Sequence, residues 1–253
     1  MTTAVRTIIF HGMDVVELRE FYASRIGRVT RRMIAQRLPP IGIGQGACVM
    51  GLGYAVPYLS PPGESSVLAF MPARQGVTHW PEQGPAASAL VDEFDLPLLE
   101  SVVDVALVIH ALEVSDNPAD MLAEVWRVLA PQGRLVLVVP NRRGLWANFE
   151  SSPFGSGQPF SRSQLLRLLK DAKFTAVSWS QALYMPPINR KFAVSAAPGL
   201  ERMGKWMMPR FSGVIIVEAV KQVYAFSSGK RARRLVPRLK PALLPAPQQS
   251  SKS

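Results

Sequence analysis

Residues 103–139 constrain the fold most, because a stretch with helical periodicity separates two apolar runs there. Val105–Ile109 and Leu135–Val139 are apolar throughout, as expected of strands that are covered on both faces. Between them, Asn117-Pro118 is typical of a helix start and Pro131-Gln132-Gly133 of a helix end. Such a helix forms a right-handed crossover between two parallel strands. The sequence therefore predicts an α/β fold with a Rossmann-like, mostly parallel sheet flanked by helices.

The other predicted elements fit around this unit. Hydrophobic patterns and turn signals predict strands at 47–50, 66–71, 87–91, 103–109, 134–139, 176–179 and 214–220. The last two are expected to form an antiparallel edge at the C-terminal end of the sheet. Further helices are expected at 14–38, hinged near Gly27, and at 161–172. Prolines and glycines between residues 72 and 85 exclude an ordinary crossover helix in that segment.

The net charge of +11 is unevenly distributed along the chain. Residues 229–253 contain seven Lys and Arg, four Pro and no acidic residue, a composition that cannot close a core. We therefore expect one domain over residues 1–228 and a disordered basic tail over 229–253. Two interpretations of the tail stay open: a solubilising extension, or an arm through which the protein contacts nucleic acid or an anionic membrane.

Several classes of protein are excluded or disfavoured. No apolar run approaches the ~20 residues of a membrane-spanning helix, and residues 1–10 lack the pattern of a secretory signal. The single cysteine, Cys48, forms neither an internal disulfide nor a multi-thiolate metal site. No His, Cys and carboxylate cluster has metal-ligand spacing, and no Gly-x-Ser-x-Gly motif is present. These features indicate a cytoplasmic protein without a metal or a transmembrane segment.

A glycine-rich turn follows the first predicted strand. Gly51-x-Gly53-x-Ala55 lets the backbone bend sharply and approach a ligand closely. Such a turn alone is a weak signal, because many turns without a ligand have the same pattern. Pro57, Pro61 and Pro62 restrict any helix after it to little more than one turn.

Two later segments strengthen the signal. Asp92-Glu93-Phe94-Asp95-Leu96-Pro97 follows the third predicted strand, and Arg127-Val128-Leu129-Ala130-Pro131-Gln132-Gly133 leads into the fifth. With the glycine turn, this ordered set over residues 46–140 resembles the class I S-adenosylmethionine-dependent methyltransferases of the small-molecule type. The resemblance implies S-adenosyl-L-methionine as cofactor, a small-molecule methyl acceptor, and a division into an N-terminal helical cap (14–38), a cofactor-binding core (46–140) and a substrate cover (181–211).

The resemblance also implies a set of site residues. His110 matches the position that faces the sulfonium and the entering substrate, which makes it the candidate catalytic residue. Methyl transfer depends on alignment of a nucleophile with the methyl carbon more than on a strong acid or base. The implied cofactor-binding residues come from the glycine turn, the end of the second strand and the acidic turn: Gly51, Gly53, Tyr54, Met71, Asp92, Glu93 and Phe94.

Departures from the family pattern keep two alternatives open. Met71-Pro72 stands where the family has a carboxylate for the ribose hydroxyls, and Ala55 replaces a glycine. One alternative is a catalytically inactive relative that binds a protein partner. The other is a nicotinamide dinucleotide enzyme in which Arg74 meets a 2′-phosphate. The transferase interpretation requires a nucleoside-sized space between Gly53 and Asp92. Filling of that space by the protein's own side chains would favour the inactive relative.

Overall fold

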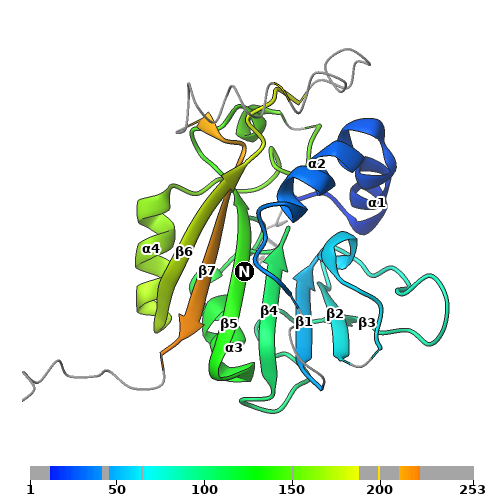
Figure 1. The fold of residues 1–253 in the computed structure, drawn as a ribbon, viewed down its shortest axis with the longest axis vertical. Coiled ribbons are helices and arrows are strands. Elements are labelled where there is room, and N and C mark those ends of the chain that lie inside the picture. The colour runs from blue at the N-terminus through cyan, green and yellow to red at the C-terminus, as the bar shows by residue number, and fades with distance from the viewer. Residues whose placement is uncertain are drawn as a thin grey trace, which may run out of the picture. The chain divides into compact units, whose positions relative to one another are not determined.

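A computed structural model describes residues 12–41, 46–63, 65–149, 151–187, 199 and 211–222 (Figure 1). The chain divides into a compact unit over residues 1–223 and a second unit over 224–253, which lies outside the described residues together with the predicted basic tail. Most of the predicted substrate cover, between 188 and 210, also lies outside them.

One seven-stranded sheet forms the centre of the first unit, with the order β3-β2-β1-β4-β5-β7-β6. The strands are β1 (Cys48–Gly53), β2 (Ser66–Pro72), β3 (Ser88–Val91), β4 (Val103–Ile109), β5 (Leu129–Pro140), β6 (Phe174–Ala182) and β7 (Val214–Lys221). Strands β1 to β5 pair in parallel, whereas β7 pairs antiparallel with both β5 and β6. The predicted Rossmann-like sheet with an antiparallel C-terminal edge is thus confirmed.

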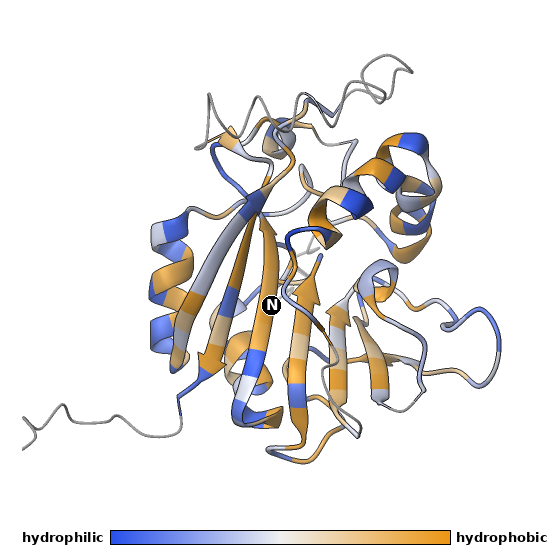
Figure 2. Cartoon of the chain, viewed as in Figure 1, coloured by the Kyte–Doolittle hydropathy of each residue, from blue (hydrophilic) through white to orange (hydrophobic). Residues whose placement is uncertain are grey.

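Helices cover both faces of this sheet. On one face, α3 (Pro118–Val128) and α4 (Arg162–Asp171) bury Met121, Leu122 and Leu165 against the strands. On the other face lie α2 (Arg25–Ala35) and the short 3-10 helices η1 (Val56–Tyr58) and η2 (Leu145–Asn148). Figure 2 shows the central strands as largely hydrophobic, as expected when both faces are covered.

The N-terminal helical region differs from its prediction in one respect. It consists of α1 (Val15–Ala23) and α2, and the break falls at Ser24 rather than near Gly27. Ser24 has an extended backbone, and its hydroxyl caps α2 by accepting from the Gly27 amide. Gly27 lies inside α2, where a Cβ would come within 1.9 Å of the Phe21 carbonyl oxygen. The glycine therefore allows the two helices to approach closely and is not the hinge.

These two helices lie over the carboxyl ends of the central strands. In Figure 1 the arrowheads of β1, β2 and β4 point toward α1 and α2. Asp14 caps α1 in a capping box with Glu17, so the position where α1 starts is well specified by the sequence. A backbone hydrogen bond of 2.8 Å from the Val15 amide to the Gln75 carbonyl then joins α1 to the segment after β2.

Candidate functional site

The order of the strands places a candidate site between β1 and β4. Strand order runs away from β1 in one direction through β2 and β3, and in the other through β4 and β5. Open α/β sheets bind ligands outside the carboxyl ends of the strands at such a switch point. Gly53 ends β1 at this point, Tyr54 directly follows it, and His110 directly follows β4.

The backbone at this switch point is tightly packed. Gly53 has φ +84°, and a Cβ there would lie 2.2 Å from the Ile109 carbonyl oxygen. A Cβ at Gly51 would lie 2.7 Å from the Leu59 side chain. Both glycines are therefore required by contacts within the protein itself.

His110 is held in an unusual environment. It has φ +56°, which is rare for a residue other than glycine, and its side chain is 3% exposed. Its Nδ1 lies 3.4 Å from a carboxylate oxygen of Glu113, which is equally buried. Neither Glu113 oxygen accepts a hydrogen bond from another described residue. A buried carboxylate so poorly paired is costly, and such departures concentrate at functional sites.

Tyr22 of α1 contacts the other side of the imidazole ring. Its hydroxyl lies 2.8 Å from His110 Nε2 and 3.2 Å from the Tyr58 hydroxyl. Burial raises the pKa of Tyr22 well above its ordinary value, so the phenol stays protonated at neutral pH. A proton on Nδ1 would face the Glu113 carboxylate and would leave Nε2 to accept from Tyr22.

The space expected for a nucleoside is occupied by side chains. Leu18 and Tyr22 of α1 form one buried cluster with Tyr54 and Met71, the residues at the ends of β1 and β2. The Tyr22 and Tyr54 rings stack with their centroids 5.7 Å apart. Met71 is completely buried, and Tyr54 is 4% exposed. With α1 docked, these side chains therefore pack together at the ends of β1 and β2, beside Gly53.

Gln75, which follows β2, is buried beside His110. Its side-chain amide donates a hydrogen bond of 2.8 Å to the His110 carbonyl, which carries it across the end of β1. The other amide atom, Oε1, is buried without a partner among the described residues. Gln75 and Glu113 were not predicted as site residues. The one sequence signal for either residue is that Glu113 lies three positions after His110.

The residues of the acidic turn are not brought into one slot. Asp92 is exposed, and its carboxylate accepts a hydrogen bond of 2.9 Å from the Phe94 amide within its own turn. Phe94 packs against the core on the α3 side. Glu93 is buried, 3.8 Å from the Arg74 guanidinium. The side chains of these three consecutive residues thus have different surroundings, whereas Gly53, Tyr54, Met71 and His110 lie at the ends of β1, β2 and β4.

Arg74 is engaged by acidic residues. Besides Glu93 it contacts Asp116 at 2.7 Å. An arginine neutralised in this way offers little to the 2′-phosphate of a dinucleotide, which removes the feature that motivated that alternative.

Arg127, in the segment that resembles the family, connects α3 to the loop after the acidic turn. Its guanidinium contacts Glu124 at 2.6 and 2.8 Å and donates to the carbonyls of Leu96 and Leu98 at 3.1 and 3.0 Å. Glu124 also accepts from the Leu96 amide at 2.8 Å. This pair on α3 therefore anchors the loop that follows the acidic turn.

We expect Arg127→Ala to lower the free energy of unfolding by roughly 1–2 kcal/mol, because several charge-assisted hydrogen bonds of a partly exposed side chain are lost. Urea unfolding measures the change, with Arg31→Ala on the exposed face of α2 as the control. Equal losses in both variants would contradict the anchoring role.

The same pair predicts a pH dependence. Hydrogen bonding from Arg127 lowers the pKa of Glu124, so its stabilisation is present above the ordinary glutamate pKa and disappears as pH falls through the lowered value. The difference in the free energy of unfolding between wild type and Arg127→Ala should therefore become smaller as the pH is lowered. A difference that is constant with pH would contradict the assignment.

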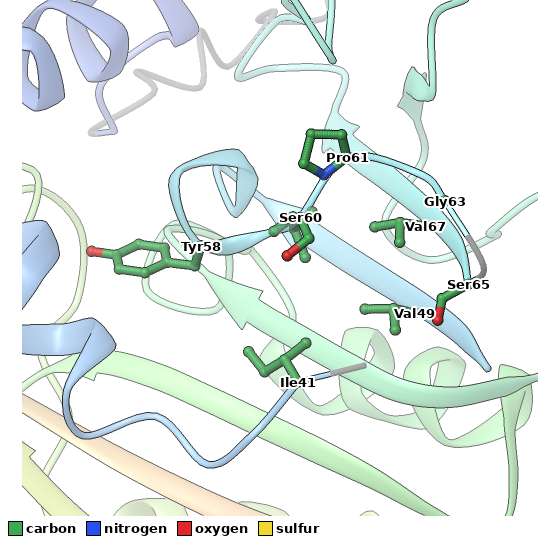
Figure 3. Close-up of a pocket in the computed structure, with 9 residues that line it drawn as sticks. Ile41, Val49, Tyr58, Ser60, Pro61, Gly63, Ser65 and Val67 are labelled. Carbon is green, nitrogen blue, oxygen red and sulfur yellow. The ribbon is translucent and has the colours of Figure 1, made fainter. Parts of the chain in front are cut away.

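One hollow of about 210 Å³ lies beside β1 and β2, away from the switch point (Figure 3). Apolar side chains of Ile41, Val49 and Val67 line it together with Ser65. Tyr58 also lines it, with its hydroxyl pointing away from these residues. Small-molecule sites usually measure ~300–1,000 Å³, so this hollow is small for a cofactor.

Two larger hollows adjoin each other near the start of α4. Their volumes are about 430 and 510 Å³, and Arg162, Gln181 and Ile215 line both. Arg37 lines the first and Arg143 the second. The Arg162 guanidinium lies over the Trp179 ring, 4.7 Å from its centroid. This edge of the sheet combines positive charge with an aromatic surface.

Two further findings concern the described residues only. They contain no group of three His, Cys, Asp or Glu side chains placed to hold a metal ion. None of their helices is both long and apolar enough to cross a membrane.

The comparisons with known proteins agree with the architecture. Residues 47–137 match the model of a methyltransferase domain family. No curated protein matches the sequence. The match spans β1 to most of β5 and includes the glycine turn, the acidic turn and the Arg127 segment. It confirms the family resemblance expected from the sequence.

Solved structures share the fold at low sequence identity. A methyltransferase described as a possible histamine N-methyltransferase from Thermotoga maritima aligns with TM-score 0.54 and 17% identity, over 82% of this chain and 96% of that one. A putative methyltransferase in complex with the Haloferax volcanii Trm112 activator gives TM-score 0.54 and 15% identity, over 82% and 95%. A geranyl diphosphate methyltransferase with geranyl diphosphate and sinefungin gives 0.50 and 16%, over 83% and 88%.

Proposed function

We propose that this chain, whose residues 47–137 match the model of a methyltransferase domain family, uses S-adenosyl-L-methionine to methylate a small molecule. The observation that carries the proposal is the family match combined with the strand order, which places His110 at the switch point. The geranyl diphosphate methyltransferase with the same fold supports it, since that protein is described with sinefungin and a small-molecule ligand.

Side chains of the docked α1 lie where the resemblance places the cofactor. Leu18, Tyr22 and Gln75 lie over the ends of β1 and β2, and Met71 provides no carboxylate for ribose hydroxyls. The proposal therefore applies to a form of the protein in which α1 has left this place. For the docked form we derive no catalytic step.

His110 and Glu113 are the residues that we propose for proton transfer. Nε2 of His110 is the nitrogen that lies 2.8 Å from the Tyr22 hydroxyl when α1 is docked. An acceptor hydroxyl or amine in the same position would release its proton to Nε2. The nearby Glu113 carboxylate would then stabilise the imidazolium.

The identity of the acceptor is constrained only by the surface near the site. We propose that it approaches from the arginine-lined hollows at the carboxyl ends of β5 and β6 and the amino end of β7, where positive charge suits an anionic group. The single cysteine supports a cytoplasmic location as part of the same proposal. Contacts with nucleic acid or anionic membranes through the basic tail remain a proposal.

Calorimetric titration with S-adenosyl-L-methionine and S-adenosyl-L-homocysteine tests the proposal. We expect measurable binding of both by the wild-type chain, and transfer of a labelled methyl group to a small molecule in cell extract. Absence of binding heat, both for wild type and for Leu18→Ser, which weakens the packing of α1, would contradict the proposed function.

The second candidate is a catalytically inactive methyltransferase-like protein that binds a protein partner. The observation in its favour is the packing of Leu18 and Tyr22 with Tyr54 and Met71. It predicts that no variant binds either nucleoside ligand and that the full chain copurifies with a specific partner. Any variant that binds the cofactor and transfers a labelled methyl group excludes it.

A further inference from the structure

The polar groups beneath α1 are poorly satisfied when α1 is docked. Gln75, His110 and Glu113 are 2%, 3% and 2% exposed. Gln75 Oε1, His110 Nδ1 and both carboxylate oxygens of Glu113 lack a hydrogen-bond partner among the described residues. Most buried polar atoms in proteins have such a partner. A polar ligand could supply the hydrogen bonds that these atoms lack when α1 is docked.

Few side chains of α1 are fully buried at this place, although Val15 and Phe21 also pack against the cluster. Only Leu18 and Tyr22 of its nine residues are buried. Its polar links to the segments after β2 and β4 are the Val15–Gln75 backbone bond and the Tyr22–His110 bond, each 2.8 Å long. A helix of this length has little stability of its own and depends on such packing. The docked state is therefore one that a competing ligand can displace.

The position of α1 coincides with that of the expected ligand. Leu18 and Tyr22 pack on Tyr54 and Met71, at the ends of β1 and β2, and Tyr22 reaches His110 at the end of β4. A ligand lying across the switch point must contact these same strand ends. Leu18 and Tyr22 already occupy the surface of Tyr54 and Met71, so a ligand cannot contact the same surface while α1 is docked.

We propose that α1 is an internal competitor for the cofactor site, so that docking of α1 and binding of S-adenosyl-L-methionine exclude each other. The inference rests on the proposed function and adds its regulation. Departure of α1 frees the Tyr54 ring and the polar side chains of Gln75, His110 and Glu113 for the ligand. The apparent affinity for the cofactor then equals the intrinsic affinity multiplied by the fraction of molecules in which α1 has left.

A disulfide between α1 and the sheet tests this directly. A Cβ at Gly76 would lie 3.8 Å from the Val15 Cβ, the usual separation across a disulfide. We would introduce Val15→Cys and Gly76→Cys into a Cys48→Ser background of the full chain. Gly76 has φ +84°, so a cysteine there is strained, but the oxidised and reduced forms carry the same strain and form a matched pair.

Calorimetric titration of both forms with S-adenosyl-L-homocysteine provides the measurement. We expect the oxidised form to bind at least tenfold more weakly than the reduced form, and the reductant to restore binding. Equal affinity in the two forms would overturn the competition but leave the proposed function intact. No binding in either form, with none in the loosened variant below, would overturn both.

A second variant keeps the proposal testable if the disulfide pair does not fold. Leu18→Ser removes a buried contact of α1, whereas Val16→Ser changes a residue on the same helix that is 46% exposed. We expect Leu18→Ser to bind the ligand several-fold more tightly than wild type and Val16→Ser to bind like wild type. Unchanged or weaker binding by Leu18→Ser would contradict the proposal.

Discussion

Gly53→Ala should destabilise the fold by roughly 2–5 kcal/mol. The new Cβ would meet the Ile109 carbonyl oxygen at 2.2 Å and the Ala111 Cβ at 2.9 Å, and the φ of +84° disfavours any side chain. Left-handed strain contributes ~1–2 kcal/mol and the forced shift of packed backbone ~1–3 kcal/mol. Relief of the overlap requires separation of β1 from the end of β4, which is the switch point itself.

Gly84→Ala is the matched control for this prediction. Gly84 has φ +95°, but a Cβ there has no neighbour within 4 Å. Its cost should be ~1–2 kcal/mol, the left-handed strain alone. Urea unfolding of both variants separates strain from overlap. Similar losses would show that the close approach at Gly53 is unimportant. Because Gly53 is required for packing, its substitution cannot report on cofactor binding.

The sequence predicted the sheet well because its strands carry local signals. Apolar runs covered on both faces, such as β4, and turn residues beside each strand specified all seven elements. The start of β5 was placed five residues too late. Leu129 is both the C-cap of α3 and the first residue of β5, and Gln132 with φ +64° lets the strand continue through a segment that reads as a turn.

The candidate site was less predictable, because its contacts join distant residues. Tyr22 and His110 are 88 positions apart, and nothing in the pattern of α1 distinguishes a helix above the site from one within it. Leu18 and Tyr22 lie one helical turn apart and read as an ordinary apolar face. The orientation of Asp92 toward its own turn is a local choice of the side chain that residue type does not reveal.

The end of β4 violates several rules of stable folding at one place. His110 has a left-handed backbone, and the carboxylate of Glu113 is buried without a hydrogen-bond donor. Natural sequences are otherwise consistent across levels, and their local exceptions concentrate where function requires them. A protein that used this fold only as a scaffold would have no evident reason to keep the pair.

A double substitution of His110 and Glu113 should therefore be tolerated better than one of its single substitutions. His110→Leu leaves the Glu113 carboxylate buried with no partner, which should cost ~3–5 kcal/mol. Replacement of both residues by Leu removes the charge together with its partner. We expect the double variant to recover most of that loss, since apolar replacement of a buried pair is often neutral or stabilising.

The comparison isolates the buried carboxylate. Both variants lose the bond from Tyr22, whose hydroxyl keeps Tyr58 at 3.2 Å, and both place Leu at the same strained position. Urea unfolding gives the stability, and transfer of a labelled methyl group gives the function. We expect the double variant to fold and to transfer no label. A double variant no more stable than His110→Leu would contradict the unpaired-charge argument, and retained transfer would remove the pair from the proposed mechanism.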